Sequence, residues 1–125
     1  MKGLFLAGMG GFFGTCLRYL FNTVIYRLLS YPTFPYGTFI INVLGCLVIG
    51  LLSGLAENRL SFTPELRIFI FIGILGGFTT FSTFGYETFG LIRDGQFLLA
   101  ATNAILQVCL GIVGVWLGYY FSRSL

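Results

Sequence analysis

The feature that most constrains this chain is a polar, glycine-containing stretch inside a long apolar segment. Residues 76–84 read GGFTTFSTF, with two adjacent glycines, four hydroxyl side chains and three phenylalanines. Glycine weakens the interior of a helix, and serine and threonine offer the backbone competing hydrogen bonds. Inside a membrane, backbone that is not helical survives only where protein or a water-filled cavity covers it. The stretch therefore predicts an interrupted membrane helix and, with it, a functional site.

Composition places the whole chain in a membrane. Of its 125 residues, 57% are hydrophobic and only 9% are charged, which is far from the composition of a soluble domain. At about 20 residues per spanning helix, the length accommodates four spans with short loops and no separate catalytic domain. We therefore expect one domain over residues 1–125, an all-α membrane protein with four transmembrane helices, the third of them broken near its middle.

Apolar runs and turn residues locate the spans. We expect them at residues 3–29, 37–56, 64–92 and 97–121. Thr63 and Pro64 are typical of a helix N-cap and first helical position, and Arg-Asp-Gly at residues 93–95 is typical of a turn. Lys2 precedes the first apolar run, but this run is longer than the hydrophobic part of a signal peptide, so we interpret it as a retained span.

The residue inventory argues against several classes of function. The chain has no histidine, which excludes a His-ligated metal and imidazole acid–base catalysis. A net charge of +3 without a basic run argues against nucleic acid as a partner. Cys16, Cys46 and Cys109 are far apart and lie in apolar segments, so we expect packing roles rather than a disulfide or a metal site. An enzyme is the least expected class.

Every expected span contains two glycines spaced four residues apart. The pairs are Gly10/Gly14, Gly50/Gly54, Gly73/Gly77 and Gly114/Gly118. Such pairs let helix backbones approach one another closely in a membrane. Their presence in all four spans predicts a compact bundle, and it says little about chemistry.

Polar side chains within the spans are mostly hydroxyls and amides. The set is Arg18, Thr38, Asn42, Thr79, Thr80, Ser82, Thr83, Glu87, Asn103 and Gln107. Uncharged donors can replace the water around a small ion without trapping it. Phe81 and Phe84 are three residues apart and share a helix face, where the electropositive ring edges can meet an anion. The same spacing also fits two core phenylalanines, and Asn42 also fits an ordinary hydrogen bond between helices.

The basic residues give only a weak preference for one orientation in the membrane. Lys2, Arg59, Arg67 and Arg123 lie on one side of four spans, and Arg27 and Arg93 on the other. This weak bias permits insertion in both directions, and two opposite copies can form an antiparallel dimer. Arg18 lies about two-thirds along the first span, where it either faces protein or water at membrane depth or extends toward the headgroups.

The chain resembles the Fluc/CrcB family of bacterial fluoride channels. The resemblance rests on residues 76–84 with Glu87, on GG-x-x-G-x-x-x-RY at residues 10–19, and on Gly37-Thr38-x-x-x-Asn42. It covers essentially the whole chain. It implies a dual-topology antiparallel homodimer in the bacterial cytoplasmic membrane, with two pores that let cytoplasmic fluoride leave passively and thereby confer fluoride resistance.

The resemblance also implies roles for individual residues. For the pore these are the phenylalanines Phe81 and Phe84, the amide of Asn42, the polar track of Ser82 and Thr83, and Thr38 and Glu87 near one end. The backbone carbonyls of Gly76 and Thr79 would hold a structural Na⁺ ion at the dimer axis. The fourth span departs from the family by offering Gly111 and Val115 where hydroxyl residues are frequent, so Gln107, one turn earlier, is expected to supply part of that polarity. This departure also leaves a heterodimer with a paralogue open.

Two other functions compete with this one. A small multidrug-resistance type exporter also has four short spans, but it needs a carboxylate inside the membrane, typically in the first span. This chain has Arg18 there, and Glu87 is its only candidate. A purely structural membrane subunit would leave the interrupted third span unexplained.

Overall fold

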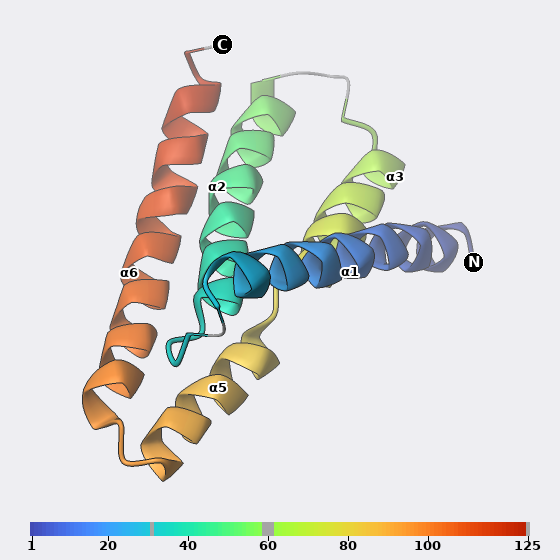
Figure 1. Cartoon of the computed structure of the whole chain (residues 1–125). Helices are drawn as coiled ribbons and strands as arrows, with labels where there is room; N and C mark the ends of the chain where they lie inside the picture. The colour runs from blue at the N-terminus through green and yellow to red at the C-terminus, as the bar shows by residue number, and fades with distance from the viewer. Residues whose placement is uncertain (31, 59–61, 125) are drawn as a thin grey trace.

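The computed structural model describes residues 1–30, 32–58 and 62–124, and all regular elements within these ranges are helices (Figure 1). The first, second and fourth spans are α1 (Lys2–Leu28), α2 (Tyr36–Asn58) and α6 (Phe97–Ser122). Four stretches are long and apolar enough to cross a membrane, namely Lys2–Leu28, Tyr36–Glu57, Pro64–Arg93 and Phe97–Ser122. Each agrees with a predicted span to within one residue at either end, which confirms the all-helical class with four membrane-capable helices.

The third span consists of four consecutive elements. They are α3 (Pro64–Arg67), η1 (Ile68–Leu75), α4 (Gly76–Phe78) and α5 (Phe81–Arg93). Thr63 caps the first of them as predicted, because its hydroxyl accepts the Leu66 N–H at 3.2 Å. η1 is a π-helix, a wider turn that recurs at functional sites and that nothing in the sequence predicted.

The predicted interruption of the third span is present and is two residues long. Thr79 and Thr80 have extended backbone, with ψ of 159° and 118°, between the end of α4 and the start of α5. We call these two residues the helix break. Gly76 and Gly77 remain helical, so the glycines precede the break and do not form it.

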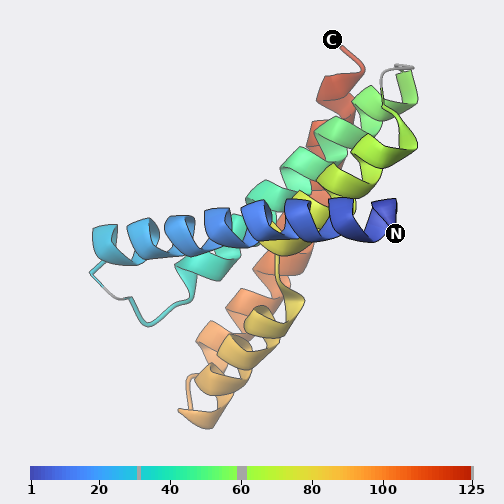
Figure 2. The same ribbon diagram turned by 90° about the vertical axis from the view of Figure 1, so that its right-hand side faces the viewer.

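Two pairs of contacting helices organise the fold. α1 packs on η1 and α4, and α2 packs along α6. Both views show α1 crossing the other helices steeply while α2 and α6 run side by side (Figures 1 and 2). The arrangement is therefore more open than the compact bundle that the glycine pairs predicted. The reason is that each glycine pair joins only two helices.

Glycines lie where the helices of each pair meet. A Cβ at Gly10 would overlap the Phe69 carbonyl oxygen, and one at Gly77 would lie 2.6 Å from the Gly11 carbonyl oxygen. We call Gly10, Gly14, Gly73 and Gly77 the glycine interface between α1 and the third span. Gly50, Gly54, Gly114 and Gly118 similarly lie between α2 and α6. At both contacts backbone approaches backbone closely, as small residues in membrane helices allow.

Few apolar side chains are buried within the described part of the chain. They are Ile41, Ala56, Leu75, Leu91 and Ala100. Large apolar side chains on all four spans are exposed, which is the surface expected of a protein that meets lipid or another protein. Among the largest fully buried side chains are the polar Thr38 and Asn103, with 1% and 0% exposure, so polar groups occupy the centre of the fold.

Candidate functional site

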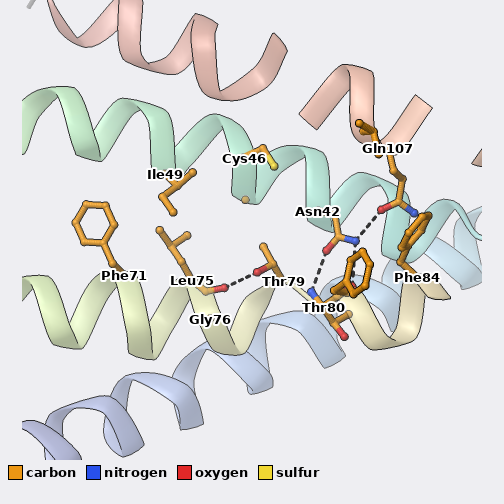
Figure 3. A pocket seen from close by; sticks show the side chains of 13 residues that line it. Asn42, Cys46, Ile49, Phe71, Leu75, Gly76, Thr79, Thr80, Phe84 and Gln107 are labelled. Carbon is orange, nitrogen blue, oxygen red and sulfur yellow. Dashed lines mark hydrogen bonds between the residues drawn. The ribbon is translucent and has the colours of Figure 1, made fainter. Parts of the chain in front are cut away.

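A side chain from α2 satisfies the backbone of the helix break. The Asn42 amide accepts the Thr80 N–H at Oδ1 (3.0 Å) and donates from Nδ2 to the Thr80 carbonyl (3.2 Å) (Figure 3). In a continuous α-helix the Thr80 N–H would instead bond to the Gly76 carbonyl. Asn42 thus takes over hydrogen bonds that the helix no longer makes, which lets two extended residues persist at membrane depth.

Arg18 reaches the same break from α1. Its Nη1 donates to the Thr79 carbonyl at 3.4 Å, and its side chain is half-buried. Of the two interpretations that the sequence left open, the structure supports the one in which the guanidinium faces protein. The break is therefore contacted from two helices, by an amide at Thr80 and by a guanidinium at Thr79.

Three hydroxyl groups gather at the start of α5. The Thr80 hydroxyl accepts the Thr83 N–H at 3.3 Å and so caps the helix. It also lies 3.1 Å from the Thr83 hydroxyl and 3.3 Å from the Ser82 hydroxyl. Ser82 and Thr83, both predicted pore residues, are thus held beside the break as a hydrogen-bonded cluster.

Phe81 and Phe84 share one face of α5, as their spacing predicted. Their ring centroids are 5.5 Å apart and the rings are tilted by 48°. Both rings, with Asn42 and Gln107, line an open cavity of about 390 Å³ between α2, the third span and α6. Phe81 is 83% exposed, so no part of the chain that the structure describes covers its outer face. Ser82 and Thr83 do not line this cavity.

Two amide side chains of α6 extend the series of hydrogen bonds that Asn42 makes. Asn42 Nδ2 donates to Gln107 Oε1 at 2.7 Å, and Gln107 Nε2 donates to Asn103 Oδ1 at 3.1 Å. Asn103 Nδ2 in turn donates to the Thr88 hydroxyl at 2.8 Å. Gln107 and Phe84 line the same cavity (Figure 3). Sequence reasoning placed Asn103 among the polar residues without a role and missed Thr88, because a single hydroxyl in a helix carries no signal of its partner.

Thr38 and Glu87 form a pair outside that cavity. The Thr38 hydroxyl donates to Glu87 Oε1 at 2.8 Å. Glu87 lines a second cavity of about 210 Å³ together with Tyr26 and Gln96. The structure therefore brings Thr38 and Glu87, both expected near one pore end, into contact with each other, but not at the cavity that Phe81 lines.

The two fourth-span positions that depart from the family pattern lie against α2. Gly111 is buried, and a Cβ there would be 3.3 Å from the Cys46 sulfur. The Val115 backbone contacts Gly50 closely. A side chain at Gly111 would therefore lie close to Cys46, and Gln107 is the polar residue that α6 contributes to the cavity.

Comparison with known proteins identifies relatives over almost the full length. The CrcB-like protein, Camphor Resistance (CrcB) family matches residues 5–119. A fluoride-specific ion channel FluC of Nitratidesulfovibrio vulgaris is 44% identical, covering 98% of both chains. The protein of the same name from Flavobacterium psychrophilum is 40% identical over 100% of both chains. Four membrane-capable helices and bacterial relatives indicate a multi-pass bacterial membrane protein. The chain belongs to the CrcB-like family.

Proposed function

We propose that this chain forms a fluoride-selective ion channel through which cytoplasmic fluoride leaves the cell passively, conferring fluoride resistance. The relatives, whose names are those of fluoride-specific ion channels, support this function. The observation that carries it is the cavity that the neighbouring Phe81 and Phe84 rings and Gln107 line together.

The lining of this cavity suits a small anion. Fluoride needs partners that replace its water and then release it, which uncharged donors do better than fixed positive charges. The Gln107 amide provides such a donor, and the edges of the Phe81 and Phe84 rings are electropositive. Ser82 and Thr83 extend the polar path beside the break, and the Thr38–Glu87 pair lies toward one end of it.

An antiparallel homodimer would complete the pathway. The outer face of Phe81 is exposed and the cavity beside it is open, so a second copy supplies the missing wall in this proposal. The weak asymmetry of the basic residues is compatible with two insertion directions, and the twofold relation buries the same surface on both copies. Pairing with a paralogue would serve the same purpose and is the alternative.

A structural Na⁺ ion fits the backbone at the break. The Thr80 N–H is donated to Asn42, so the Gly76 carbonyl lacks the partner it would have in a continuous helix, and Gly76 is exposed. Hard cations prefer oxygen ligands, and in this proposal the Gly76 and Thr79 carbonyls of each copy would provide them, with the Thr79 carbonyl using the lone pair that is left beside its hydrogen bond from Arg18. The ion would neutralise carbonyl dipoles where two copies of the third span meet.

The experiment that tests the function is fluoride efflux from liposomes that contain the purified protein. We expect fluoride efflux without chloride efflux, and we expect it without any proton gradient. Phe81→Ile should lower the fluoride rate while the protein remains dimeric, since the ring edge is lost. Phe89→Ile is the matched control, because Phe89 is also exposed on α5 but lies outside the cavity lining.

Well-folded protein that passes no fluoride would contradict the proposal. Efflux that requires a proton gradient would instead support the exporter, with Glu87 as the titrating group. A wild-type rate in Phe81→Ile would mean that the pathway lies elsewhere.

A further inference from the structure

We infer that Thr88 and Asn103 are positioning residues of the pore, which hold the Gln107 amide in the one orientation that presents an N–H to the cavity. The inference rests on the proposed function and extends it to two residues that do not line the cavity. Its basis is a continuous chain of hydrogen bonds through α2, α6 and α5.

All the hydrogen bonds in this chain point the same way. The Thr80 N–H donates to Asn42 Oδ1 (3.0 Å), Asn42 Nδ2 to Gln107 Oε1 (2.7 Å), Gln107 Nε2 to Asn103 Oδ1 (3.1 Å), Asn103 Nδ2 to Thr88 Oγ1 (2.8 Å), and Thr88 Oγ1 to the Phe84 carbonyl (2.7 Å). We call this series the amide relay. It begins at the helix break and ends on the backbone of Phe84, one of the two cavity phenylalanines.

Backbone groups fix the direction of the relay at both ends. The Thr80 N–H can only donate and the Thr80 carbonyl can only accept, so the Asn42 amide has a single orientation that satisfies both. At the other end the Phe84 carbonyl can only accept, so the Thr88 hydroxyl must donate to it. An amide flip in between would place two donors or two acceptors together, which is unfavourable at a buried site.

The direction of the relay determines which amide keeps an N–H that is free to bind an anion. Both N–H groups of Asn42 are engaged, one by the Thr80 carbonyl and one by Gln107 Oε1. Gln107 uses one N–H for Asn103, which leaves its second N–H at a residue that lines the cavity. Asn103 is 0% exposed and cannot contact the ion. Within the relay the anion-facing donor is therefore Gln107, while Asn42 holds the break.

Thr88 and Asn103 are required because Gln107 has a flexible side chain. A glutamine held only at Oε1 could rotate its amide away from the Phe84 ring. The bond from Nε2 to Asn103 removes that freedom, and the bond from Asn103 to Thr88 fixes the Asn103 amide in turn. This arrangement also supplies α6 polarity one turn before Gly111, which has no side chain to offer.

Thr88→Val tests the inference, because valine keeps the shape of threonine and removes the hydroxyl. We expect fluoride efflux to fall about five- to tenfold, the size expected for one lost hydrogen bond, and fluoride selectivity over chloride to fall with it. Thr88→Ser should restore both. Thr23→Val is the matched control, since the Thr23 hydroxyl makes the same intrahelical bond, to the Tyr19 carbonyl at 2.8 Å, without a side-chain relay.

A double-mutant comparison separates positioning from general structure. Gln107→Met removes the amide, and in that background Thr88→Val should have no further effect on flux, because the group it positions is gone. Wild-type protein that conducts no fluoride would refute the proposed function itself. Wild-type conduction combined with equal flux and selectivity in Thr88→Val and Thr23→Val would overturn only the relay. Unfolding of both Thr88→Val and Thr88→Ala would show a structural role and would also overturn it.

Discussion

The glycine interface and the helix break are neighbours in the third span, and they are built in opposite ways. At the glycine interface, backbone meets backbone and the described contacts involve no polar side chain. At the break, backbone groups that have lost helix partners are satisfied by the side chains of Asn42 and Arg18. The glycine interface depends on the absence of side-chain atoms, and the helix break depends on specific hydrogen-bond donors and acceptors.

The third span therefore combines a tightly packed segment with a segment whose backbone is held by polar side chains. Close packing leaves no room for adjustment, whereas a hydrogen-bonded break keeps its shape only while each partner is present. Substitutions in the first region should therefore disturb assembly, and substitutions in the second should disturb conduction.

The largest effect is expected for Gly14→Ala. A Cβ at Gly14 would overlap the Ile74 carbonyl oxygen, so α1 must shift from the third span, at a cost of about 1–3 kcal/mol or more. The yield of folded protein by size-exclusion chromatography measures this. Gly8→Ala is the matched control, because no atom outside its own helix lies within 4 Å of the added Cβ. Equal yields for the two variants would remove the glycine interface as a determinant of assembly.

A large effect of the other kind is expected for Asn42→Asp. The carboxylate can still accept the Thr80 N–H, but it cannot donate to the Thr80 carbonyl or to Gln107. Two acceptors lose their donor, and each unsatisfied buried group costs about 1–3 kcal/mol, so we expect at least about a tenfold loss of fluoride efflux from folded protein. Unchanged efflux would mean that the break does not depend on Asn42.

An intermediate effect is expected for Thr38→Val, which removes the 2.8 Å hydrogen bond to Glu87. The pair lies outside the cavity that Phe81 lines, so stability should fall by about 0.5–1.5 kcal/mol while efflux changes about twofold. Thermal unfolding and efflux of Thr38→Val and Thr38→Ser would be compared. A loss of efflux as large as that of Asn42→Asp would place this pair within the rate-determining part of the pore.

The smallest effect is expected for Lys2→Ala. Lys2 and Glu65 form an ion pair at 3.1 Å, but their side chains are 76% and 48% exposed. Exposed pairs contribute little to stability, so neither the melting temperature nor efflux should change measurably. A clear loss of stability or efflux would show that the ion pair between the starts of α1 and α3 contributes as well as the glycine interface and the helix break.

Much of the fold could be predicted from the sequence because membrane spans are long and apolar. The interruption was also predictable, since hydroxyl residues and glycines stand together at residues 76–84. Its exact place was not. Gly77 is required by the approach of α1, not by the unwinding, and only the packed structure distinguishes these two reasons for a glycine.

The sequence identified many residues of the candidate site, but it did not identify the hydrogen bonds between them. Phe81 and Phe84 share a helix face because their spacing dictates it. The partners of Asn42 depend on the rotation of α2 against α6 and the third span, which no local pattern specifies. Thr88 was missed for the same reason, because its partner Asn103 lies on another helix.

The most direct test of the central claim is the fluoride efflux rate per folded protein, measured side by side for Gly14→Ala and Asn42→Asp. We predict that the folded fraction of Gly14→Ala, however small, conducts at the wild-type rate, whereas folded Asn42→Asp conducts at about a tenth of it or less. Equal rates per folded protein in the two variants would contradict the division between a glycine interface needed for folding and a helix break needed for conduction.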